Sequence, residues 1–96
     1  MIIIVKILNT ETEPIKQERI QRASTIRNTR RFTAEVNGDP LNAGVLWEVS
    51  QGGGEIDQRG VFIPPYDRAV GKSIISAISL TDRSKRDTAI VRYTDF

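Results

Sequence analysis

The sequence predicts an all-β domain, built as an antiparallel β-sandwich of about seven strands with an extra strand at its N-terminus. Apolar and polar residues alternate along several short runs, of which 45–50 (VLWEVS) is the clearest. Between the runs, Gly, Pro, Asn and Asp recur every 8–12 residues or so, a spacing that is typical of short strands joined by turns. A chain of 96 residues has room for one domain with a single modest core.

The alternation also predicts which side chains form the core. Residues two apart in a strand point to the same face, so each run has one buried and one solvent-facing row. Trp47 is expected to be the central aromatic residue, packed between two sheets. The predicted core consists of Phe32, Val36, Val45, Trp47, Val49, Ile56, Phe62, Ile75, Ala77 and Val91.

The segment 52–65 carries the clearest turn signals. Three consecutive glycines at 52–54 allow the chain to change direction with positive φ at little steric cost. The run from Asp57 to Gly60 has Asp first and Gly last, as a type I turn prefers. The dipeptide Pro64-Pro65 ends the strand 61–63, because proline cannot donate to a strand ladder.

Residues 1–14 are expected to lie outside the main domain, which we place at 15–96. The run Met1–Leu8 (MIIIVKIL) is predicted to be a strand with apolar residues on both faces. It is far shorter than the roughly 20 residues that span a bilayer. It also lacks the basic region and cleavage site of a signal peptide. Because an exposed apolar edge invites pairing, we expect strand exchange through Ile2–Leu8, with a copy of the chain or another protein domain.

Residues 15–31 allow two interpretations. The extended one places strands at 19–23 and 25–27 on either side of a kink, and the β-branched residues Thr25 and Ile26 favour it. The alternative is a helix from Pro14 to Arg27, with proline at its first position. In either case the segment is basic, and a patch that binds phosphates or acidic polysaccharides is a candidate site. Its residues would be Arg19, Arg22, Arg27, Arg30 and Arg31.

The composition predicts neither catalysis nor a cofactor. The chain has no histidine and no cysteine, which removes the commonest general base, thiolate nucleophiles and the usual transition-metal ligands. Ser50, Ser76 and Ser79 are interpreted as strand and turn residues. The Asp residues are interpreted as turn formers rather than as ligands of a metal. We therefore expect no enzymatic activity, no cofactor and no metal.

Two further contact sites are suggested by exposed side chains. The loop at Tyr66, Asp67 and Arg68 is a candidate for contact with a partner protein. A surface glycan is a further partner class, although with the other aromatic residues assigned to the core only Tyr66, Tyr93 and Phe96 could form a binding platform.

Five motifs in order carry a resemblance to a known family. They read FTAEVNGD, GVLWEVS, GGGEID, RGVFIPP and ISAISLTDRSKRDTAIV, and the match that contains them runs from about Arg19 to Thr94. In order and spacing this pattern resembles the bacterial immunoglobulin-like domains, especially group 2. The resemblance implies an immunoglobulin-like sandwich that serves as a spacer, adhesive or decoration module.

The resemblance also implies a location. It suggests a secreted or cell-surface bacterial protein of which this module is a part, or a phage virion. No catalytic residues are carried over from the family. The alternative function is a small basic protein that binds nucleic acid or another polyanion through the arginine patch, although aromatic residues that could stack on bases do not interleave with it.

Overall fold

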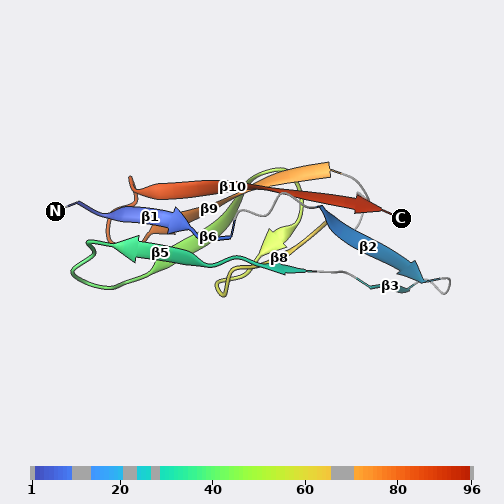
Figure 1. The fold of residues 1–96 in the computed structure, drawn as a ribbon, viewed down its shortest axis with the longest axis horizontal. Coiled ribbons are helices and arrows are strands. Elements are labelled where there is room, and N and C mark those ends of the chain that lie inside the picture. The colour runs from blue at the N-terminus through green and yellow to red at the C-terminus, as the bar shows by residue number, and fades with distance from the viewer. Residues whose placement is uncertain (1, 10–13, 21–23, 27–28, 66–70, 96) are drawn as a thin grey trace.

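The computed structural model describes residues 2–9, 14–20, 24–26, 29–65 and 71–95, and every regular element in these ranges is a β-strand (Figure 1). This confirms the predicted all-β class. It also makes the helical alternative for residues 14–27 wrong, because the described positions of that segment are extended. The strands are β1 (Ile4–Ile7), β2 (Ile15–Ile20), β3 (Ser24–Ile26), β4 (Arg30–Arg31), β5 (Ala34–Asn37), β6 (Val45–Gln51), β7 (Glu55–Ile56), β8 (Val61–Ile63), β9 (Gly71–Ser79) and β10 (Arg86–Asp95).

The strands form three sheets. Their orders are β1-β5, β4-β8-β7 and β3-β2-β10-β9-β6. All pairs are antiparallel except β2 with β10. That pair is parallel because β2 continues in the direction of β1 without reversing, and β10 runs the same way (Figure 1). The wholly antiparallel arrangement that the sequence predicts is therefore corrected at this one pair.

Strands β4 and β5 are separated only by Phe32 and Thr33, where the backbone leaves the regular ladder. The amide of Phe32 donates to the carbonyl of Gly60 at 2.7 Å, and the carbonyl of Thr33 accepts from the amide of Leu8 at 2.9 Å. These bonds join the interruption to the β7–β8 turn on one side and to the end of β1 on the other. The β1-β5 and β4-β8-β7 sheets are thereby joined into a nearly continuous layer.

One buried cluster lies between this layer and the five-stranded sheet, which makes the fold sandwich-like. Phe62 is fully buried, and its ring stacks on Tyr93 with a centroid distance of 6.3 Å. Of the predicted core, six residues belong to the cluster and four pack against it as partly buried side chains. The six are Phe32, Trp47, Phe62, Ile75, Ala77 and Val91, and the four are Val36, Val45, Val49 and Ile56.

The extra N-terminal strand is present as β1, and it contributes to the same cluster. Ile3, Val5 and Ile7 are buried there, whereas the residues between them face outward. The described residues of the segment 1–14 therefore pack into the same hydrophobic core as the rest of the described chain. The strand follows the alternation of a sheet with one wet face, and the protein itself covers only half of its apolar side chains.

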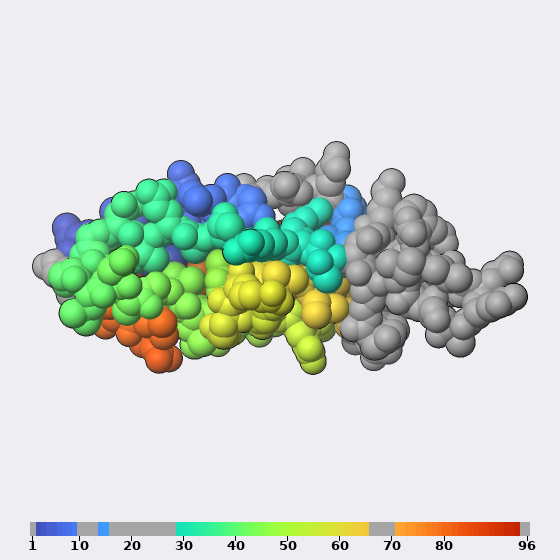
Figure 2. Space-filling view, turned by 90° about the horizontal axis from the view of Figure 1, so that it is seen from below, coloured from blue at the N-terminus to red at the C-terminus, as the bar shows by residue number. Residues whose placement is uncertain are grey.

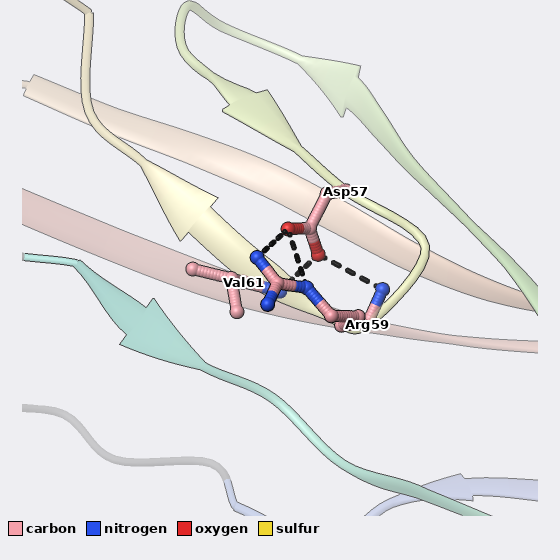
Figure 3. Close-up of polar contacts among 3 residues, drawn as sticks. All are labelled: Asp57, Arg59 and Val61. Atoms are coloured by element: carbon pink, nitrogen blue, oxygen red, sulfur yellow. Dashed lines mark hydrogen bonds and ion pairs between the residues drawn. The ribbon is translucent and has the colours of Figure 1, made fainter.

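The β7–β8 hairpin is closed by Asp57, as the type I turn predicts. The carboxylate accepts hydrogen bonds from the amides of Arg59 and Val61 at 2.9 and 3.0 Å, and it also pairs with the Arg59 guanidinium (Figure 3). The amide of Gly60 donates to the carbonyl of Asp57 at 3.0 Å. Gly60 has a φ of 83°, and a Cβ there would overlap the carbonyl oxygen of Phe32, so this position requires glycine.

Candidate interaction surface

The outer face of β1 is the most apolar exposed strand surface in the described part of the chain. Ile2, Ile4 and Leu8 are 75%, 57% and 52% exposed, although isoleucine and leucine usually lie inside. Lys6 is the only polar residue in this row. It lies opposite Glu35 of β5, a cross-strand position that favours opposite charges.

Other exposed aliphatic side chains lie at the N-terminal end of the molecule, near the start of β1. Leu41, in the loop between β5 and β6, is 72% exposed, and Leu80, after β9, is 40% exposed. Figure 2 shows the N-terminal strand in blue, the β5–β6 region in green and the β9–β10 hairpin in orange gathered at this end. We refer to Ile2, Ile4, Leu41 and Leu80 as the aliphatic end.

Backbone contacts bring these segments together. Ile2 passes directly over Gly38, where an added Cβ would overlap the carbonyl oxygen of Ile2. The amide of Leu80 donates to the carbonyl of Gly44 at 3.1 Å. The N-terminal residues and the β5–β6 loop therefore meet at Gly38, and that loop is fastened in turn to the β9–β10 hairpin.

Asp39 organises the loop that presents Leu41. Its carboxylate accepts hydrogen bonds from the amides of Leu41 and Ala43, at 2.9 and 3.1 Å, and from the hydroxyl of Thr81 at 2.9 Å. Partial desolvation raises the pKa of this carboxyl, but the hydrogen bonds outweigh it and the net pKa lies below its ordinary value. An ionised Asp39 thus holds the loop against the β9–β10 hairpin.

Three polar side chains form hydrogen bonds with backbone groups at the edges of strands. Asn9 continues the line of β1: its Nδ2 donates to the carbonyl of Arg31 at 2.7 Å, and its Oδ1 accepts from the amide of Thr33 at 2.8 Å. A carboxamide has one acceptor and donors in the same plane, as a peptide group does. Asn9 therefore replaces a strand residue where the β4–β5 ladder is interrupted.

The other two edge contacts come from Gln58 and Asp87. The Gln58 amide bonds both the N–H and the C=O of Trp47 on the outer strand β6, at 3.4 and 3.3 Å. The Asp87 carboxylate accepts from the amide of Ile7 at 2.8 Å, on the side of β1 away from β5. Unpaired strand edges are templates for adding another chain, and inward or edge-bound polar side chains oppose this. We call Asn9, Gln58 and Asp87 the edge caps.

The predicted arginine patch is only partly within the described side chains. Arg30 and Arg31 are consecutive in β4, so they point to opposite faces; Arg30 is half-buried and Arg31 is exposed. Arg19 lies in β2, paired with Thr25 of β3. Arg22 and Arg27 lie outside the described residues. The two arginines whose side chains are described therefore do not share one surface.

The predicted partner loop, Tyr66, Asp67 and Arg68, also lies outside the described residues, as does Phe96. Of the aromatic residues considered for a glycan platform, Tyr93 is described. It is buried in the core, and its hydroxyl lies 3.2 Å from that of Ser73. Tyr93 therefore cannot contribute to a glycan platform.

The serines considered as nucleophiles take part in the packing of the sheet. Ser76 and Ser79 are fully buried in β9. Ser76 is hydrogen-bonded to Ser50, and Ser79 accepts hydrogen bonds from the amides of Thr81 and Asp82. These contacts stabilise the β6–β9 pair and the β9–β10 hairpin.

The described residues contain no cluster of three or more acidic side chains that could hold a metal ion. No helix in the described ranges is long and apolar enough to cross a membrane. No family model, curated protein or solved structure matches the chain.

The edge caps and the aliphatic end were not predicted from the sequence. Asn9 belongs to the polar segment 9–14, and Leu41 and Leu80 have neighbours that suggest only turns. The signal that could have found Asn9 is an Asn directly after an apolar strand, since a carboxamide there can extend the ladder by one residue.

Proposed function

We propose that the chain is a non-enzymatic, immunoglobulin-like module of a bacterial surface protein or a phage virion, where it acts as a spacer, an adhesive unit or a decoration. It binds other protein domains, including copies of itself, through its loops and its N-terminal strand. This proposal combines the family resemblance of the sequence with the arrangement of strands and exposed side chains.

The strand order supports the immunoglobulin-like part of the proposal. With β4 and β5 taken as two halves of one strand, one layer has the order β1, β5/β4, β8, β7 and the other contains β10, β9, β6. In chain order these are strands A to G, and the layers correspond to the ABED and GFC sheets of the constant-type immunoglobulin sandwich. The β2–β3 hairpin is then an insertion between strands A and B.

The observation that carries the functional part is the aliphatic end. Four large aliphatic side chains from three separate segments are exposed at the same end of the molecule, and hydrogen bonds of Asp39 hold two of the segments in place. Exposed apolar clusters of this kind mark protein contact sites. The whole molecule is only 19 by 18 Å across its long axis, so a contact at one end is small and would have to be repeated or supplemented elsewhere.

Localisation in the organism that encodes the chain tests this proposal. Antibodies against the purified chain should label the cell surface, or purified virions should contain the chain by mass spectrometry. A chain that carries both Ile2→Lys and Leu41→Lys should be found on the cell surface or in virions at a several-fold lower level than the native chain. Its melting temperature should be unchanged. The matched control is Ile90→Lys, at a 46% exposed isoleucine on the outer face of β10. Recovery of the chain only from the cell interior contradicts the proposal.

A further inference from the structure

We infer that β1 is an exchangeable strand, and that Ile2–Leu8 of one copy takes the place of β1 in a second copy. We call this place, along β5 and against the start of β10, the β1 seat. The inference rests on the proposed function, since it names one partner of the module, a second copy of this chain. It also specifies the contact as replacement of a strand rather than addition of one.

The fit of the occupant to the seat is visible in the protein itself. Ile3, Val5 and Ile7 fill the core with exposures of 3%, 9% and 2%. The register with β5 pairs Val5 with Val36 and Ile7 with Ala34. A second copy's β1 has the same sequence, so it would reproduce this packing and the same ladder without any change in the rest of the domain.

The strand is attached in a way that permits exchange. Among the described residues it pairs only with β5. Its outer face is exposed, so no described element has to move away before it leaves. Residues 8–14 connect it to β2, and seven residues can extend over roughly 25 Å, enough to reach a neighbouring domain.

The edge caps favour exchange over edge-to-edge addition. A foreign strand that added to the free side of β1 would compete with Asp87 for the amide of Ile7. A strand that added to β6 would compete with Gln58 for both backbone groups of Trp47. An exchanged β1 meets neither obstacle, because it regains the bonds to Asp87 and β5 that the original strand made.

Concentration decides how much exchange occurs. A short connector gives the strand of the same chain an effective concentration in the mM range at its own seat. The closed monomer therefore dominates in dilute solution, and exchange becomes significant when copies are held close together, as in a repeated assembly. A covalent trap can collect the exchanged form even where it is the minor one.

The test uses cysteine pairs in the full-length chain, which has no cysteine of its own. One chain carries Val5→Cys, and a second, tagged chain carries Val36→Cys. These positions face each other in the β1–β5 register, at a spacing that suits a disulfide. Mixed at up to mM concentration under mild oxidation, the two chains should form a covalent heterodimer through these positions, with a yield that rises with concentration.

The controls separate exchange from collision. Val5→Cys mixed with Asn42→Cys, in the exposed β5–β6 loop, measures random oxidation, and the matched pair should exceed it at least about tenfold. The double variant with both Val5→Cys and Val36→Cys should form a bond within one chain, which verifies the register. Ile7→Cys with Ala34→Cys is a second matched pair if a Val5 variant folds poorly.

Two results overturn the inference. One is an intrachain bond in the double variant together with a matched-pair yield no higher than the control at mM concentration. This result leaves the proposed function intact, because localisation and the aliphatic end are tested separately. The other is failure of both double variants to form the intrachain bond while they remain folded, which would contradict the β1–β5 register on which exchange depends.

Discussion

Strands β9 and β1 both contain several isoleucines, but the two strands lie in different environments. Strand β9 lies between β6 and β10 and is paired along both edges. Most of its residues are buried on both faces, including the outward-facing Ser76 and Ile78. Strand β1 is paired along one edge, and its Ile4 is 57% exposed. The place of a strand in its sheet, rather than its own apolar content, decides how much of it is covered.

Because of this difference, β9 is suited to stabilising the domain and β1 is suited to contact with a partner. The central strand provides contacts on every side, so its replacement would require the whole sheet to open. Strand β1 and the preceding Ile3 contribute three buried side chains, but only one ladder holds the strand. Elements of low local stability are those that proteins use for exchange and switching. The comparison can be sharpened by four measurements.

The largest expected effect comes from truncating equivalent isoleucines in the two strands. Ile75→Ala in β9 should cost about 2–5 kcal/mol, because it leaves a cavity in a fully buried site. Ile7→Ala in β1 should lie at the low end of that range, since an edge strand can shift to fill the space. Urea unfolding of each variant measures the loss.

Ile4→Ala, on the outer face of β1, is the matched control and should change stability by no more than about 0.5 kcal/mol. An equal loss for Ile75→Ala and Ile7→Ala would remove the distinction between the strands. It would mean that β1 is held as firmly as the centre of the sheet.

A smaller effect is expected from the cap that extends β1. Asn9→Ala removes two hydrogen bonds to the β4–β5 interruption and should destabilise the domain by about 1–2 kcal/mol. Asn9→Asp should lose about half as much, because it keeps the acceptor for Thr33 and loses the donor to Arg31. Asn37→Ala, at an exposed position on β5, is the control. A loss no greater than that of the control would show that the cap contributes nothing.

Acid pH tests the β7–β8 and β9–β10 turns, which depend on the carboxylates of Asp57 and Asp82. The amide of Val61 is the main cause that lowers the pKa of Asp57, with the Arg59 side chain and amide adding to it. The hydroxyl and amide of Ser84 lower the pKa of Asp82. Because these pKa values lie below the ordinary 3.8 in the folded state, the unfolded chain binds protons first as the pH falls.

Their contribution is therefore complete above about pH 4 and is lost progressively below it. The urea midpoint of the native chain should fall between pH 5 and pH 2.5. Asp57→Asn should show a smaller fall over the same interval, since an amide does not titrate but still accepts a hydrogen bond. Identical pH profiles for the two proteins would mean that Asp57 does not contribute to the acid sensitivity.

The smallest expected effect concerns the basic segment. With Arg30 and Arg31 on opposite faces of β4, we expect weak retention on immobilised DNA at about 50 mM salt, where phosphate contacts are strongest. Replacing both Arg19 and Arg22 by Ala should change the elution salt only slightly. Strong retention that this double substitution abolishes would favour the polyanion-binding alternative.

The local pattern of apolar and polar residues was sufficient to predict most strands and the core residues. Alternation around Trp47 and Val91, and the Asp57–Gly60 turn, depend on neighbours in the sequence, and these features are present in the structure. The parallel β2–β10 pair was not predictable in this way, because it depends on which strands meet after folding. The same reason applies to Asn9 and Asp87, whose partners lie 22 to 80 residues away.

The candidate surface was predictable only in part. The exposed row of β1 follows from an apolar run at one end of the chain, and the sequence suggested that something must cover it. The aliphatic end was not predictable, since Leu41 and Leu80 are far apart in sequence and their segments come to the end where β1 begins through contacts of Gly38 and Asp39. A three-dimensional arrangement of loops cannot be derived from the spacing of single leucines.

The positions of the two chain ends have a mechanical consequence. The N-terminus lies at one end of the long axis and the C-terminus lies toward the other, where the β2–β3 hairpin extends further, and β1 and β10 run along this axis (Figure 1). A pulling force applied through the ends would act along β1 and β10, and so perpendicular to the hydrogen bonds of the β1–β5 pair. Those bonds would share the force in shear instead of opening one after another, a geometry that suits a tether under tension.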